Sequence, residues 1–289
     1  MKVDFFIVGA PKAGTTSLYH YLNEHPKISM SSVKEPNYFS HEELEAQKLY
    51  YKSNKINSLD SYHNLFPTRD ANLIYGEASV SYLFYKNVAE KIKTYNKNAK
   101  IIILLRNPIE RAFSHYLMDV RLGLISKSFK SVVDSFETTS KNKLFYQQYI
   151  ELGKYYNQIS NYKRLFHDKN ILIIDYEDFK NKTTLCVSNV FDFLQIDTSF
   201  MPNLDLTHNT FKKPKFTFIE KLYSNHSIRC LINKLISSKF KNYINQMVFD
   251  KEDKPILSQD LHERLKSIFK NDVNKLSNML NKDFNKWIK

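Results

Sequence analysis

The chain has 289 residues and a formal net charge of +13 at pH 7, and 42% of its residues are hydrophobic. This length suits one α/β unit, so we predict a single domain over residues 1–289. The charge favours anionic partners without choosing between nucleotide, nucleic acid, acidic glycan and membrane surface. Two cysteines are too few for a disulfide scaffold, and no apolar run reaches the roughly 18 residues of a membrane span. We therefore expect a cytoplasmic protein without stable membrane insertion.

The first twenty-odd residues predict a strand, a glycine loop and a helix. Residues 5–8 are an apolar run typical of a buried strand, and apolar residues recur at helical spacing over 18–22. Between them, Gly9 and Gly14 let the backbone turn tightly and present N–H groups to an anion at the start of the helix. The pattern indicates a phosphate loop, with an ordinary tight turn as the simpler alternative.

The spacing of the two glycines is that of a nucleotide-binding P-loop, which has a lysine directly after the second glycine. Here Thr15 stands at that position, and the lysine lies inside the loop as Lys12. The hydroxyls of Thr15 and Thr16 are in place to cap the helix or to reach a ligand. The loop therefore indicates an anion site and argues against an ordinary NTPase.

A second informative stretch begins with the aliphatic run 101–105, which predicts a buried parallel strand. Pro108 suits the first turn of the next helix, so Arg106 would emerge at the carboxyl end of the strand, where open α/β sheets bind ligands. Ser114 would follow about two turns into that helix. A guanidinium beside a serine hydroxyl suits a second phosphate, and an ion pair of Arg106 with Glu110 is the alternative.

The remaining pattern predicts strands at 27–30, within 72–82 and at 170–174, and helices through 88–95, 153–166, 179–194 and from 258 onward. Glu35 precedes a proline, which disfavours helix, and its local sequence suits an exposed loop carboxylate. Acids at 175–178 would bind magnesium or cap the next helix. The basic loop 207–215 would close over a nucleotide or act as a linker.

Together these stretches resemble the sulfotransferases that use 3′-phosphoadenosine 5′-phosphosulfate (PAPS), in the branch of the bacterial and heparan sulfate enzymes. Gly9-Ala-Pro-Lys12-Ala-Gly14-Thr-Thr-Ser17 is similar to the 5′-phosphosulfate loop, and Arg106-Asn-Pro-x-x-Arg111-x-x-Ser114 is similar to the 3′-phosphate motif. The resemblance implies an α/β, P-loop-like three-layer fold with a central parallel sheet flanked by helices. It also implies PAPS as the donor, 3′-phosphoadenosine 5′-phosphate (PAP) as the product, and no metal.

The resemblance also implies roles for individual residues. Lys12 would contact the phosphosulfate bridge, and Glu35 would be the general base, with His20 or His115 as the next candidates. Asn37 stands where glycan enzymes often have a histidine, and residues 78–80 lack their second catalytic lysine. The residues implied in nucleotide binding are Pro11, Lys12, Ala13, Gly14, Thr15, Thr16, Ser17, Arg106, Ser114, Tyr155, Lys212 and Lys213.

The implied reaction moves a sulfuryl group from PAPS to an acceptor hydroxyl on a carbohydrate or small metabolite. A P-loop kinase acting on a small molecule is the alternative from another enzyme class, and the displaced Lys12 argues against it. A basic nucleic-acid-binding protein is a third hypothesis, but it rests on charge and aromatic content without a recognition motif. We therefore predict a hydroxyl-bearing acceptor such as a glycan as the partner, and no nucleic acid.

Overall fold

The computed structural model describes residues 2–51, 56–66, 70–134, 139–204 and 255–289, and the backbone of 213–214 and 249–250. Its centre is a parallel five-stranded sheet with the order β2-β3-β1-β4-β5. The strands are β1 (Phe5–Gly9), β2 (Ile28–Met30), β3 (Ile74–Ala78), β4 (Lys100–Leu105) and β5 (Ile171–Asp175). A separate antiparallel pair joins β6 (Lys213–Pro214) and β7 (Phe249–Asp250).

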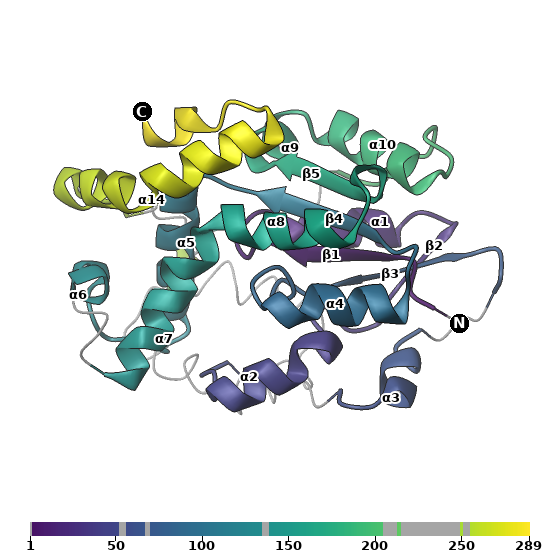
Figure 1. Ribbon diagram of the computed structural model, residues 1–289, viewed down its shortest axis with the longest axis horizontal. Coiled ribbons are helices and arrows are strands. Elements are labelled where there is room, and N and C mark those ends of the chain that lie inside the picture. Colours follow the sequence, from purple (N-terminus) through teal and green to yellow (C-terminus); the bar gives the residue numbers. More distant parts are fainter. Residues whose placement is uncertain are drawn as a thin grey trace.

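Helices cover both faces of the sheet. Those before β4 are α1 (Thr15–Asn23), α2 (His41–Gln47), α3 (Leu59–His63) and α4 (Lys86–Tyr95). Those after it are α5 (Pro108–Arg121), α6 (Phe129–Asp134), α7 (Ser140–Tyr149), α8 (Tyr155–Leu165), α9 (Tyr176–Asn181), α10 (Thr183–Leu194) and α14 (Gln259–Leu280). Short 3-10 turns are η1 (Tyr38–Ser40), η2 (Glu151–Gly153), η3 (Asp168–Asn170) and η4 (Asn285–Ile288). Figure 1 shows α4 and α8 together over one face and α1 behind the other, which confirms the predicted three-layer α/β fold.

The strands are apolar because helices shield them on both sides. Every residue of β1 is buried, and residues 101–105 of β4 have no exposed surface. Burial on both faces favours such continuous apolar runs. Since β1 lies between β3 and β4, the turn that follows β1 opens at the middle of the carboxyl edge of the sheet. This is the place where open α/β sheets bind ligands.

The predicted helix over 179–194 is wrong in one respect, because the structure has two helices there. The chain turns at Lys182, whose φ of −133° and ψ of 46° lie outside the helical range. The hydroxyl of Thr183 donates to the carbonyl oxygen of Phe179 at 2.8 Å across this break. The shorter α9 leaves Phe179 beside the carboxyl edge of the sheet, where it reaches the cavity described below.

For the acids at 175–178 the sequence allowed either magnesium binding or helix capping, and in the structure Asp175 is a helix cap. Asp175 accepts a hydrogen bond from the N–H of Glu177 at 3.1 Å and so caps α9. Its other oxygen accepts from Lys286 Nζ at 2.8 Å. The helical pattern beyond 258 is a single helix of 22 residues, α14. Within the described part of the chain, no helix is both long and apolar enough to span a bilayer, and the cytoplasmic location stays a prediction.

Candidate active site

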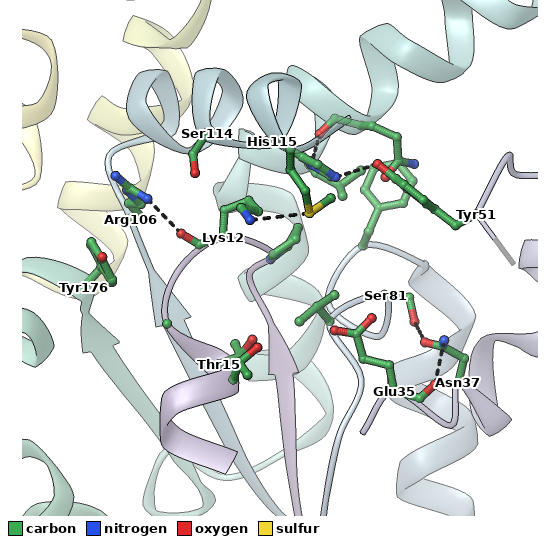
Figure 2. A pocket seen from close by; sticks show the side chains of 18 of the residues that line it. Lys12, Thr15, Glu35, Asn37, Tyr51, Ser81, Arg106, Ser114, His115 and Tyr176 are labelled. Carbon is green, nitrogen blue, oxygen red and sulfur yellow. Dashed lines mark hydrogen bonds between the residues drawn. The ribbon is translucent and has the colours of Figure 1, made fainter. Parts of the chain in front are cut away.

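A cavity of about 990 Å³ opens at the carboxyl edge of the sheet. Its walls come from the segments that follow β1, β2, β3, β4 and β5, which lie far apart in the sequence. Figure 2 shows Lys12 near the middle, with Arg106 and Tyr176 on one side and Glu35 and Tyr51 on the other. The predicted site residues that line this cavity are Pro11, Lys12, Gly14, Thr15, Thr16, Ser17, Glu35, Arg106 and Ser114.

The other predicted site residues do not line it. Ala13 and Tyr155 are completely buried. The hydroxyl of Tyr155 donates to the backbone carbonyl of Arg106 at 2.9 Å, so Tyr155 holds the end of β4 from beneath the cavity wall. Lys212 lies outside the described residues, and Lys213 is described only by its backbone in β6.

The turn between β1 and α1 requires a glycine at its end. Gly14 has a left-handed φ of 89°, and a Cβ atom there would lie 3.1 Å from the ring of Phe179. Gly14 is also the N-cap of α1, and no side chain caps the helix. Among the described residues, the hydroxyls of Thr15, Thr16 and Ser17 have no hydrogen-bond partner. These hydroxyls and the N–H groups of the first helical turn are therefore available to an anion.

Lys12 projects from this turn into the cavity. Its Nζ lies 3.5 Å from the sulfur of Met118, and it forms no ion pair with a described carboxylate. Burial, reinforced by Arg121 and Arg106, lowers the pKa of Lys12 to about 8. Its backbone has a left-handed φ of 69°, a conformation that non-glycine residues adopt mainly where the fold enforces it. The result is a half-buried ammonium group that faces the cavity.

Arg106 occupies the end of β4 as predicted. Its Nη1 donates to the carbonyl of Lys12 at 3.1 Å, and its Nη2 donates to the Glu110 carboxylate at 3.0 Å. Its guanidinium lies 4.6 Å from the ring centre of Tyr176, a cation–π contact that holds the group flat. Arg106 thus forms the ion pair with Glu110 that was the alternative in the sequence analysis, and it also lines the cavity. Ser114 lies on the same wall, and its hydroxyl has no partner among the residues the structure describes.

Glu35 lies in a strained segment after β2. Its φ is 61°, and its N–H donates to the carbonyl of Ala78 at 2.8 Å, which ties the segment to the end of β3. One carboxylate oxygen lies 2.5 Å from Lys34 Nζ, and 40% of the side chain is exposed. The carboxylate is close enough to Lys12 to oppose the fall in the pKa of that lysine. Glu35 is therefore a solvent-accessible carboxylate across the cavity from the β1–α1 turn.

Asn37 positions this segment, a role that the sequence did not reveal. Its φ is 54°, and its side-chain amide donates to the carbonyl of Glu35 at 3.0 Å. Its Oδ1 accepts from the hydroxyl of Ser81 at 2.7 Å, and its N–H donates to Ser79 Oγ at 3.0 Å. The asparagine that departs from the family pattern thus locks the backbone on which Glu35 is carried.

A cluster of tyrosines around the buried Asp119 lies beside Met118. Asp119 accepts hydrogen bonds from the hydroxyls of Tyr50, Tyr51 and Tyr149 at 2.8, 2.7 and 2.7 Å. Tyr51 also lies 2.8 Å from Nε2 of His115, whose Nδ1 lies 3.0 Å from the Gln148 carbonyl. Burial and the neighbouring Arg111 hold the pKa of His115 well below its usual value, so the ring is neutral. In the sequence, the only sign of this cluster is the four-residue spacing of His115 and Asp119, which places both on one face of a helix.

Comparisons with known proteins agree with this geometry. A family model described as a sulfotransferase domain matches residues 2–279. Carbohydrate sulfotransferase 15 of Mus musculus is 24% identical over 243 residues, which cover 66% of this chain and 43% of that protein. Bifunctional heparan sulfate N-deacetylase/N-sulfotransferase 1 of Mus musculus is 25% identical over 231 residues, 78% of this chain and 25% of that protein. The chain therefore spans less than half the length of these relatives.

Solved structures show the same fold. A sulfotransferase from Alicyclobacillus acidocaldarius superposes with a TM-score of 0.75 and 27% identity, covering 100% of both chains. The mouse sulfotransferase SULT7A1, solved in complex with PAP, has a TM-score of 0.50 and 18% identity, covering 94% of this chain and 84% of that one. At this identity the second likeness concerns the fold alone.

Proposed function

Since the chain belongs to the sulfotransferase domain family, we propose that it transfers a sulfuryl group from PAPS to an acceptor hydroxyl on a carbohydrate or small metabolite. The main support is a single cavity lined both by Lys12 in the β1–α1 turn and by Arg106 with Ser114 after β4. A nucleotide phosphorylated at its 3′ and 5′ positions needs two such anion sites. A P-loop kinase is not favoured, because its lysine would follow the second glycine of the loop.

In this proposal the β1–α1 turn binds the 5′ end of the donor. The hydroxyls and N–H groups of Thr15, Thr16 and Ser17 hold the 5′-phosphate, where the positive end of the helix dipole favours an anion. Arg106 and Ser114 hold the 3′-phosphate through charge-assisted hydrogen bonds. The bound donor supplies the sulfuryl group and a phosphate leaving group.

Lys12 and Glu35 carry the chemistry of transfer. Like phosphoryl transfer, the reaction is an in-line displacement in which negative charge grows on the departing oxygen. Lys12 stabilises that oxygen as the bond from sulfur to phosphate oxygen breaks. Glu35 takes the proton of the acceptor hydroxyl as the new oxygen–sulfur bond forms. The products are a sulfate ester and PAP, with the proton on Glu35.

Donor binding is tested by melting the protein with PAP, with ATP and magnesium, or with an oligonucleotide. A ligand that binds only the native state raises the melting temperature. At a ligand concentration of 100 Kd, the free energy of unfolding rises by about 2.7 kcal/mol. Of the three ligands, we expect only PAP to raise the melting temperature. A shift with ATP and magnesium but none with PAP would refute the proposal.

Lys12→Ala tests the catalytic role. We expect transfer from PAPS to be abolished while the melting temperature stays close to that of the wild type, because the sulfur of Met118 is the only hydrogen-bond partner of Nζ among the described residues. Lys27→Ala, an exposed lysine after α1, is the matched control and should keep full activity. Near-normal turnover of Lys12→Ala would overturn the assignment.

A further inference from the structure

Asp119, in the last turns of α5, is a buried carboxylate that the proposed mechanism does not use. The residue has no exposed surface, and its hydrogen-bond partners are the hydroxyls of Tyr50, Tyr51 and Tyr149. These hydroxyls are neutral donors, and no cation of the described residues forms an ion pair with Asp119. A buried charge without an opposite charge beside it costs free energy, so the presence of this carboxylate calls for an explanation.

The carboxylate lies directly behind residues that line the cavity. Asp119 follows Met118, whose sulfur lies 3.5 Å from Nζ of Lys12. Tyr51, which donates to Asp119, lines the same cavity as Lys12 and Met118. Figure 2 shows Tyr51 on the same side of Lys12 as the contact with Met118. Burial raises the pKa of Asp119, and the tyrosine hydroxyls and the ammonium group of Lys12 oppose this rise. The charges of Asp119 and Lys12 therefore act on each other.

Lys12 is otherwise surrounded by charges that disfavour its ammonium form. Burial lowers the pKa of Lys12, and the cations Arg121 and Arg106 lower it further. The anions Asp119 and Glu35 act in the opposite direction. Glu35 is 40% exposed and has a lysine ammonium group at 2.5 Å, so solvent and this lysine weaken its effect. Asp119 has neither form of screening.

The surroundings of Asp119 keep its charge in one place. Two of its hydroxyl donors belong to the segment after α2 and the third to the end of α7. The ring of His115 stacks on that of Tyr51 at 6.0 Å, and its Nε2 lies 2.8 Å from the tyrosine hydroxyl. Burial and Arg111 hold the pKa of His115 well below its usual value, so this ring is neutral and does not cancel the carboxylate.

We propose that Asp119 is a positioning residue for sulfuryl transfer, which keeps the ammonium group of Lys12 charged against the two neighbouring arginines. This deepens the proposed function and rests on it. Asp119 does not line the cavity and so would touch neither donor nor acceptor. It would act through Lys12, whose positive charge stabilises the departing phosphate oxygen.

The first test measures the pKa of Lys12 without any acceptor. The wild type and Asp119→Asn are labelled with trace acetic anhydride over a range of pH, and mass spectrometry of the peptide that carries Lys12 gives its reactivity. Only the neutral amine reacts. We expect a pKa of about 8 in the wild type. Loss of an opposite charge favours the neutral amine, so this pKa should fall by about 1 unit in Asp119→Asn, and a fall of less than about 0.5 overturns the inference.

Tyr149→Phe is the matched control. It removes one hydrogen bond from the same carboxylate but keeps the charge, and Tyr149 does not line the cavity. We expect both variants to melt at a lower temperature than the wild type, but only Asp119→Asn to change the pKa of Lys12. An equal fall in the two variants would assign the effect to distortion of the tyrosine cluster and would contradict the inference.

A second variant serves if Asp119→Asn does not fold. Replacing a hydrogen-bonded group together with its partners costs less than leaving the partners unpaired. The quadruple variant Asp119→Leu, Tyr50→Phe, Tyr51→Phe and Tyr149→Phe therefore removes the charge and its donors together. The pKa of Lys12 should fall in this variant by the same amount, and a value equal to that of the wild type would refute the role of Asp119.

The catalytic consequence is measured as conversion of PAPS to PAP with water as the acceptor. The alkaline fall of kcat/KM should lie about 1 pH unit lower in Asp119→Asn than in the wild type and Tyr149→Phe. An alkaline fall that stays in place contradicts the inference. The melting-temperature shift with PAP, measured well below the pKa of Lys12, reports donor binding separately. Absence of this shift in the wild type would refute the proposed function, whereas a normal shift with an unchanged Lys12 pKa in Asp119→Asn would refute this inference alone.

Discussion

Lys12 is a half-buried ammonium group whose pKa of about 8 should be visible in the kinetics. Above this pH the side chain becomes neutral and no longer stabilises a departing phosphate oxygen. We therefore expect kcat/KM, which reports the free enzyme, to fall as the pH rises through about 8. In Lys12→Arg the guanidinium stays charged, so the alkaline fall should move upward even if the rate is lower. An alkaline limb at the same pH in Lys12→Arg would assign it to another group.

Glu35 is the second residue whose role is open to direct test. Glu35→Gln keeps the shape of the side chain but removes its capacity to accept a proton, so turnover should fall by about 10²–10⁴-fold. The melting-temperature shift with PAP should be unchanged, because the donor side of the cavity is untouched. Glu42→Gln, an exposed α2 residue that does not line the cavity, is the control. An unchanged rate would move the base elsewhere, although His115 has partners at both ring nitrogens.

Among the elements, β3 carries two residues whose type follows from its position beside β1. A Cβ atom on Gly76 would lie 2.1 Å from the ring of Phe5, so only glycine lets the two strands pair there. The next residue, Glu77, is completely buried, and one of its oxygens accepts from the hydroxyl of Tyr82 at 3.1 Å. Its other oxygen has no partner in the described structure.

Burial raises the pKa of Glu77 to about 7 in the folded state. Because the folded state holds this proton more tightly than the unfolded state, stability is greatest below the unfolded pKa and falls as the pH rises to about 7. Glu77→Gln removes this effect, which amounts to roughly 3 kcal/mol at 1.36 kcal/mol per pKa unit. We expect urea unfolding to show stabilisation by the variant at pH 8 and little change at pH 4. Stabilisation that is equal at both pH values would exclude ionisation as the cause.

At the scale of the whole molecule, the C-terminal turn η4 supports the proposed 3′-phosphate side of the cavity. The indole of Trp287 is buried and lies edge-on to the ring of Tyr155, with 6.2 Å between ring centres. Its carbonyl accepts from Asn107 Nδ2 at 3.3 Å. Tyr155 in turn holds the carbonyl of Arg106. The last residues of the chain thus reach the strand end that carries the arginine.

We expect Trp287→Ala to destabilise the protein by about 3–5 kcal/mol, as large-to-small core substitutions do, and to weaken PAP binding. Trp287→Phe should be milder, since the indole N–H has no partner among the described residues. Urea unfolding and the PAP melting-temperature shift measure the two effects. Leu185→Ala, at a site that is 56% exposed, is the control for stability. A full PAP shift in Trp287→Ala would show that η4 does not support the site.

Most elements of this fold, and part of its cavity, could be predicted from local patterns. The apolar runs that became β1 and β4 and the helical spacing of α1 and α14 are local signals, because each depends on burial within one segment. The glycines and Lys12 of the first turn, and Arg106 after β4, predicted two anion sites, because each signal lies within one short segment. The break at Lys182 was missed because apolar spacing continues across it.

The sequence by itself therefore determined the strands, the glycine turn after β1 and the arginine at the end of β4. Only the tertiary structure decided which loops share one cavity, since this depends on the strand order β2-β3-β1-β4-β5. That order brings Glu35 to the far side of Lys12 and leaves Tyr155 beneath the cavity wall. The physical reason is that contacts between distant segments depend on how whole faces of helices and sheet pack together. The periodicity within one segment does not indicate which other segments it will contact.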